Sequence, residues 1–185
     1  MMSSPEASSY FPDQQLYNVG SEHYLEIIRA AREAVAIPVI SSLNAASEEG
    51  WTDYATQLQL AGASALELNI YFVPTDIWLP GRDVEQRYLD IVRAVKGRVT
   101  IPVAVKVGPY FSAPGNMAMQ LVEAGVNGLV RFNRFYQPDI DLIRLQISTD
   151  LDLSRSSEMR LPLLWIAVLH GRVKASLADG RAYGR

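Results

Sequence analysis

Four polar residues stand where short apolar segments of this sequence end. Asn44 follows IPVISSL, Asn69 ends LELN, Lys106 lies near the end of PVAVKV, and Asn133 follows LVRF. A carboxamide offers donors and acceptors, so such asparagines can bind the C=O and N–H groups of a small planar heterocycle. A lysine beside that ring can stabilise negative charge that develops on it. The pattern predicts a ligand site, although a lone asparagine at a strand end more often forms a turn.

Lys106 also has a structural interpretation. It lies inside an apolar run, where an inward-pointing ammonium group needs a partner. Glu67 alternates onto the interior side of the preceding strand and could supply that partner. The residues alone leave both roles open.

Residues near Asn69 and Asn133, and the histidine at a helix end, could each have either a structural or a functional role. Tyr71, Phe72 and Trp78 follow Asn69 and could line a pocket or form an apolar plug. His170, in LHGR at a helix end, fits a partner for the helix dipole better than a catalyst. Two arginines flank Asn133 and could bind an anion, although solvated arginines are more common: Arg131 and Arg134.

The composition is that of an ordinary soluble domain. Of the 185 residues, 49% are apolar and 20% charged, with a net charge of −3. The sequence contains no stripe of basic residues, which argues against a nucleic-acid-binding surface. The absence of cysteine excludes disulfides, thiolate metal sites and a cysteine nucleophile, and two histidines are too few for a histidine-rich metal site. No apolar run approaches the roughly 20 residues of a membrane span. The N-terminus lacks the apolar region of a secretory signal, so we expect a cytoplasmic protein.

Helical and strand patterns alternate along the chain, which indicates βαβ units and a parallel sheet. Ser21 is a plausible N-cap, and the helical face that follows carries Tyr24, Ile27, Ile28, Ala31 and Val35. The run 37–43 fits a strand buried on both faces. The further predicted elements are helix 47–61, strand 64–70, helix 83–96, strand 101–107, helix 115–123 and strand 127–132.

The chain contains an internal repeat. RAAREAVAIPVISSL (29–43) aligns without a gap on RAVKGRVTIPVAVKV (93–107), and AGASALEL (61–68) corresponds to AGVNGLVR (124–131). Each AG pair ends a helix, where glycine suits a left-handed conformation. A period of roughly 64 residues, two βα units per module, is typical of a (β/α)₈ barrel.

The barrel predicted from this chain is partial, with about four of the eight parallel strands. Residues 138–155 alternate like an inserted β-hairpin, and 156–170 form a last helix. We therefore expect an irregular lead over 1–20, a partial barrel domain over 21–177 and an aberrant or truncated tail over 178–185. Since half a barrel cannot close, either the chain is a truncated or frame-shifted product, or it pairs with a second copy or a complementing fragment.

Several long segments resemble the dihydroorotate dehydrogenase family, most closely its bacterial dihydroorotate dehydrogenase-like branch. They are IPVISSLN, ALELNIYFVPTD, EQRYLDIVRAVKGRVTIPVAVKVGPYFS, GLVRFNRFYQPDIDL and LPLLWIAVLHGRV. The resemblance extends from about Ser9 to Leu177. It implies an FMN-dependent (β/α)₈ barrel of pyrimidine biosynthesis, which oxidises a dihydropyrimidine acid.

The resemblance also implies site residues. Asn44 and Lys106 correspond to positions beside FMN, and Asn69 to a residue that touches both flavin and substrate. Asn133 corresponds to an asparagine that holds the polar edge of the substrate.

Two departures from the family pattern affect these expectations. The family carries a Cys or Ser base in the loop after the position of Asn69, whereas this chain has Tyr71-Phe72-Val73-Pro74. Thr75 or Tyr71 could stand in, but both are weak bases without activation. After SLA the chain continues DGRAYGR instead of the family's glycine-rich strands, which bind the FMN phosphate. We therefore expect FMN binding by this chain to be weak or absent.

Two other functions remain open at this stage. The chain could be a non-catalytic half-barrel that self-associates through its open edges. It could also belong to a non-flavin barrel lyase in which Lys106 forms a Schiff base.

Overall fold

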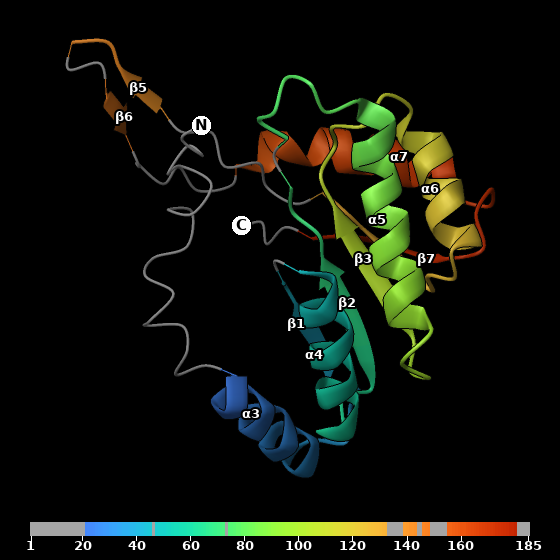
Figure 1. Cartoon of the computed structure of the whole chain (residues 1–185). Coiled ribbons are helices and arrows are strands. Elements are labelled where there is room, and N and C mark those ends of the chain that lie inside the picture. Colours follow the sequence, from blue (N-terminus) through green and yellow to red (C-terminus); the bar gives the residue numbers. More distant parts are fainter. Residues whose placement is uncertain are drawn as a thin grey trace.

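A computed structural model describes residues 21–45, 47–72, 74–132, 139–143, 146–148 and 155–180. Its main feature is a sheet of five parallel strands in the order β1-β2-β3-β4-β7 (Figure 1). The strands are β1 (Ile40–Leu43), β2 (Ala65–Asn69), β3 (Val103–Val107), β4 (Gly128–Arg131) and β7 (Ser176–Asp179). The helices are α3 (Ser21–Ala34), α4 (Glu48–Leu60), α5 (Gly81–Lys96), α6 (Pro114–Glu123) and α7 (Arg160–Leu169), which the 3₁₀ turn η1 (Ser156–Met159) precedes.

The helices lie on one side of the sheet. In Figure 1, α4, α5, α6 and α7 follow one another along this side, and α3 lies beside α4 at one end. Short loops return each helix to the next parallel strand, as in one arc of a (β/α)₈ barrel. The partial barrel predicted from the sequence is confirmed.

The two faces of the sheet differ because side chains alternate along each strand. On the helix-covered face, the strand residues are almost all fully buried, including Leu66, Leu68, Val103, Val105 and Leu129. The opposite face, which a closed barrel would surround, is here called the inner face. Its residues on β2 and β3 are only half-buried.

The expectation that run 37–43 forms a strand buried on both faces is wrong. The strand starts at Ile40, whose side chain lies on the inner face and is 63% exposed. β1 is the end strand of the described sheet, and nothing described covers its inner face. The apolar residues of the run 37–43 would suit the interior of a closed barrel, but the five described strands do not close one.

Local sequence signals mark several helix ends, although Ser21, the predicted N-cap, is itself the first residue of α3. Ser47 caps α4, because its Oγ accepts a hydrogen bond from the backbone N–H of Gly50. Gly62 and Gly125, the glycines of the two AG pairs, have φ of 98° and 107°. Both helices thus end in the left-handed conformation that glycine adopts without strain.

The C-terminal part of the chain differs from the sequence expectation in one respect. Ser176–Asp179 form a fifth strand, β7, which pairs in parallel with β4. The sequence gives a weak signal here, because only Leu177 of this strand is a large apolar residue. The predicted boundary at residue 178 therefore falls inside a strand, and residues 181–185 lie outside the described part. The predicted hairpin is confirmed as β5 (Asp139–Asp141) and β6 (Gln146–Ser148), which pair antiparallel.

The burial of α3 is narrower than its sequence suggests. Leu25 and Ile28 are buried, whereas Ile27, on the predicted apolar face, is exposed, as is Val35, which that prediction included but which follows the end of α3. Among the described residues, the helix packs mainly against α4 at the end of the sheet, so its other side is left exposed. No helix among the described residues is long and apolar enough to cross a membrane.

Candidate functional site

The predicted site residues of the first three strands lie at one level of the sheet. Asn69 and Lys106 are register partners across β2 and β3, so their side chains project side by side on the inner face. Asn44 directly follows Leu43, whose partner Leu68 precedes Asn69. Its side chain is exposed, and that of Asn69 is half-buried. The fold thus brings two carboxamides and one ammonium group to the C-terminal ends of adjacent strands.

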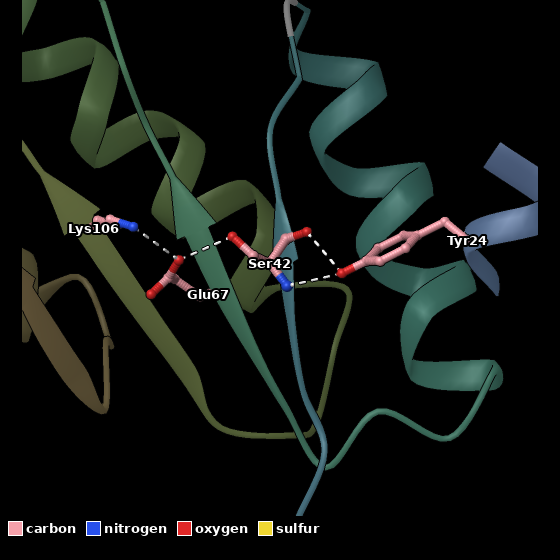
Figure 2. Close-up of polar contacts among 4 residues, drawn as sticks. All are labelled: Tyr24, Ser42, Glu67 and Lys106. Atoms are coloured by element: carbon pink, nitrogen blue, oxygen red, sulfur yellow. Dashed lines mark hydrogen bonds and ion pairs between the residues drawn. The ribbon is translucent and has the colours of Figure 1, made fainter. Parts of the chain in front are cut away.

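Lys106 belongs to a chain of polar contacts across these strands (Figure 2). Its Nζ lies 3.8 Å from Oε1 of Glu67, and both side chains are 21% exposed. The same carboxylate oxygen accepts a hydrogen bond of 2.9 Å from the hydroxyl of Ser42 on β1. The ion pair that the alternation suggested is therefore present, and Ser42 fixes one side of it.

Tyr24 of α3 is the last member of this series of polar contacts, at the edge of the sheet. Its hydroxyl lies 3.2 Å from both the backbone N and the backbone O of Ser42, accepting from one and donating to the other. β1 has no strand on this side in the described sheet, so the hydroxyl satisfies backbone groups that a further strand would pair. The period-two spacing that places Ser42 beside Glu67 was a usable sequence signal, whereas the role of Tyr24 depends on the docking of α3.

The loops that follow β2 and β3 form a cavity of about 270 Å³ at the same end of the sheet. Its walls are mostly aromatic, so for Tyr71 and Phe72 the pocket is the one of the two open interpretations that the structure favours. Trp78 is not part of it and is 85% exposed. The lining residues are Tyr71, Phe72, Pro74, Val84, Tyr88, Gly108, Tyr110 and Phe111.

The loop after β2 is held in place by α5. Tyr88 of α5 is buried beside the backbone of Phe72, and its ring packs edge-on against Phe111 at 5.2 Å. Burial raises the pKa of Tyr88 to about 12. The guanidinium of Arg87 lies 4.4 Å from the ring centroid of Phe72. These contacts order an apolar loop, and none of them supplies a base.

The two candidate stand-ins for a catalytic base differ in location. Tyr71 lines the cavity, whereas Thr75 is exposed. No hydrogen bond or ion pair joins Thr75 to an acid or a base in the described part of the chain. Asn133 and Arg134 lie outside the described residues.

Arg131 is not solvated, contrary to the common case. It lies on the helix-covered face of β4 and is only 1% exposed. Nη2 donates to the carbonyl of Pro114 at 3.4 Å, and the guanidinium lies near the rings of Phe132 and Trp165. Nε and Nη1 have no hydrogen-bond partner among the described residues. Burial lowers the pKa of Arg131 to about 10. Because it lies on the face opposite Lys106, Arg131 does not belong to the candidate site.

Two further expectations concern His170 and metals. His170 is the C-cap of α7 and is exposed, which suits the predicted position at the end of the helix dipole. Within the described ranges, no group of His, Cys, Asp and Glu residues could hold a metal ion.

Comparison with curated proteins identifies relatives in one enzyme family. Over 130 residues the chain is 32% identical to "Putative dihydroorotate dehydrogenase A (fumarate)" of Aeropyrum pernix. Over 132 residues it is 30% identical to the catalytic subunit of dihydroorotate dehydrogenase B (NAD(+)) of Methanocaldococcus jannaschii. The chain is similar to dihydroorotate dehydrogenases. Each match covers 69% of this chain and 42% of the relative, so the chain spans less than half the length of these dehydrogenases. No family model matches the sequence.

Solved structures support the fold. The chain superposes on phosphonopyruvate hydrolase with a TM-score of 0.54 at 18% identity, over 95% of this chain and 64% of the other. It superposes on dihydrodipicolinate synthase from Bacillus clausii with a TM-score of 0.50 at 17% identity, over 89% and 53%. At such identities the likeness concerns the barrel architecture alone.

Proposed function

We propose that this chain carries the ring-binding part of an FMN site in an oxidoreductase of the dihydroorotate dehydrogenase type. The observation that carries the proposal is the register pair Asn69 and Lys106, at the strand ends of an inner face. Similarity to dihydroorotate dehydrogenases supports the cofactor and the substrate class, a dihydropyrimidine acid of pyrimidine biosynthesis.

The residues present fit a flavin ring. Asn69 and Asn44 offer amide donors and acceptors, which suit the alternating C=O and N–H groups of the ring. Lys106 supplies a positive charge on the same half-buried face, where it can stabilise negative charge on the ring. When bound, FMN would accept the hydride removed from the substrate. Asn133 is proposed to hold the polar edge of that substrate.

Neither candidate base, Tyr71 or Thr75, is the Cys or Ser that the family carries. A base must reach the proton that it removes and have a suitable pKa. Tyr71 lines the cavity formed by the loops after β2 and β3 together with α5, but Asn69 and Lys106 do not line it, so neither Tyr71 nor the exposed Thr75 is shown beside them. Both residues are weak bases without activation. Either the substrate is a small planar molecule other than dihydroorotate, or a residue outside the described part of the chain supplies the base.

The proposal predicts weak FMN binding by this chain, because the contacts named above concern only the ring. The test is a fluorescence titration of FMN with the purified protein. We expect saturable quenching with a dissociation constant of roughly 10⁻⁴ M or weaker, which corresponds to at most about 5.5 kcal/mol. A protein that purifies with stoichiometric flavin would contradict the weak binding.

A second candidate function is a non-catalytic half-barrel that associates through its open surfaces. The observation in its favour is the exposed inner face, on which Ile40 is 63% exposed at the end strand. Strand edges of this kind pair readily with other chains. Light scattering distinguishes the two candidates, since a stable dimer that binds no flavin favours the half-barrel.

The Schiff-base interpretation of Lys106 is less favoured. A Schiff base requires an amine that is free to reach a carbonyl carbon, whereas Nζ of Lys106 is held 3.8 Å from the carboxylate of Glu67. Borohydride trapping with a carbonyl substrate tests this point, and we expect no adduct on Lys106.

A further inference from the structure

The side chain of Lys106 lies between two features that no comparison assigns. On one side, the carboxylate of Glu67 lies 3.8 Å from its ammonium group. On the other side, Gly180 follows β7 beside the methylene chain of the lysine. A Cβ atom built on Gly180 would lie 2.9 Å from Cε of Lys106 and 3.5 Å from its Nζ.

Glu67 is itself held in place. Ser42 donates to its Oε1 at 2.9 Å, and the backbone of Ser42 is bonded on both sides by the hydroxyl of Tyr24 (Figure 2). The carboxylate is 21% exposed, so the ion pair is partly shielded from solvent. Three successive elements, α3, β1 and β2, therefore determine where this negative charge lies.

The backbone at Gly180 is fixed as well. Its N–H donates to the carbonyl of Arg131 at 3.1 Å, which extends the β4–β7 ladder by one residue. A side chain here would also come within 3.0 Å of Cγ1 of Val130. Because the ladder restrains the backbone, a methyl group at this position displaces Lys106.

We infer that Glu67 and Gly180 are the positioning residues of Lys106: Glu67 holds its ammonium group, and Gly180 leaves the space that its side chain occupies. This inference rests on the proposed function, because that function gives the reason why Lys106 must be held at this position. The ammonium group stays level with Asn69 only while both residues are present.

The first test is the NMR signal of the lysine ammonium groups in the full chain. The Lys106 signal is identified by its loss in Lys106→Met. We expect Glu67→Gln to shift this signal and to raise its proton exchange with water roughly fivefold, as expected for loss of a partly exposed ion pair. Ser42→Ala should shift the Lys106 signal less and in the same direction. This variant replaces Glu67→Gln in the test if Glu67→Gln does not fold.

A matched control is available for the carboxylate. Glu85 also accepts a serine hydrogen bond, from Ser112 at 3.0 Å, but no lysine pairs with it among the described residues. Glu85→Gln should leave the Lys106 signal unchanged. An unchanged signal in both Glu67→Gln and Ser42→Ala would overturn the role of Glu67.

The second test is a double-mutant cycle on stability between Gly180 and Lys106. Gly180→Ala should lower the urea midpoint more in the wild-type background than in Lys106→Ala, because the shorter side chain removes the contact with Cε and leaves only the contact with Cγ1 of Val130. Gly81→Ala is the control, since a Cβ there meets nothing within 4 Å. Additive effects of Gly180→Ala and Lys106→Ala would overturn the role of Gly180.

Neither test uses flavin. A negative result here therefore leaves the outcome of the FMN titration unaffected. Conversely, absence of FMN binding with the expected NMR shifts would refute the proposed function and leave the positioning of Lys106 intact.

Discussion

Asn69 and Lys106 face each other across the β2–β3 ladder, on the one face of the sheet that the helices leave open. The pairing joins an amide to an ammonium group at the end of the barrel arc where (β/α)₈ enzymes carry their chemistry. The glutamate two residues before Asn69 forms an ion pair with the lysine. A bound ring would therefore meet both donors and acceptors within three adjacent strands.

Replacing the buried arginine should stabilise the protein. In Arg131→Met, a guanidinium with two unpaired nitrogens becomes an apolar side chain of similar length. We expect a gain of about 1–3 kcal/mol in unfolding free energy at neutral pH, measured by urea denaturation. Arg93→Met, on the exposed face of α5, should change it by less than about 0.5 kcal/mol. A destabilised Arg131→Met would mean that the contacts with Phe132, Trp165 and Pro114 outweigh the burial of the charge.

Tyr88 should make stability pH-dependent at alkaline pH. Its pKa is raised by burial from an ordinary value of 10.0 to about 12 in the folded chain. The unfolded chain therefore loses this proton first. The contribution is fully present below pH 10 and is lost as the pH rises through about 12.

The difference in unfolding free energy between the wild type and Tyr88→Phe isolates this group, since other titrations cancel. We expect the difference to change by up to about 3 kcal/mol across this range. A difference that does not vary with pH would refute the assignment.

A side chain at Gly125, which follows the C-cap of α6, should lower the stability of the protein. Gly125 has φ of 107°, and Gly125→Ala should cost about 1–2 kcal/mol in unfolding free energy. Gly81→Ala, at the first residue of α5, adds a methyl group in open space and serves as control. Equal effects of the two substitutions on the urea midpoint would argue against the left-handed conformation.

Removal of the Tyr24 hydroxyl should expose the edge of β1. Tyr24→Phe leaves the N–H and C=O of Ser42 without their partner, which should cost about 1 kcal/mol. We also expect more self-association in light scattering, because the edge becomes available to another chain. Tyr54→Phe is the control, since no hydrogen bond of that hydroxyl is found within the described residues. Unchanged mass and stability in Tyr24→Phe would show that the hydroxyl does not protect the edge.

The sequence predicted the elements that depend on local signals. The gapless repeat located β1 and β3, and the AG pairs located the ends of α4 and α6. Strand alternation placed Glu67 beside Lys106. These features depend on periodicity and on the steric freedom of glycine, both of which can be read from single residues.

Other features depend on contacts between distant segments. β7 has only one large apolar residue and is a strand because β4 offers it a ladder. Arg131 is buried because α6 and α7 cover its face, and the run 37–43 is half exposed because no strand lies beyond β1 in the described part of the sheet. The role of Gly180 follows from its packing on Lys106, which no sequence pattern specifies.

The central claim is that Asn69 and Lys106 contact a flavin ring, and a titration with riboflavin alongside FMN tests it most directly. If this chain binds only the ring, both flavins should bind with similarly weak affinity. Lys106→Met and Asn69→Ala should each weaken both roughly tenfold, as expected for a lost hydrogen bond to a charged or buried group. Lys174→Met, which removes an exposed lysine, should have no effect. Identical riboflavin affinity in the wild type, Lys106→Met and Asn69→Ala, or no saturable binding of either flavin, would contradict the claim.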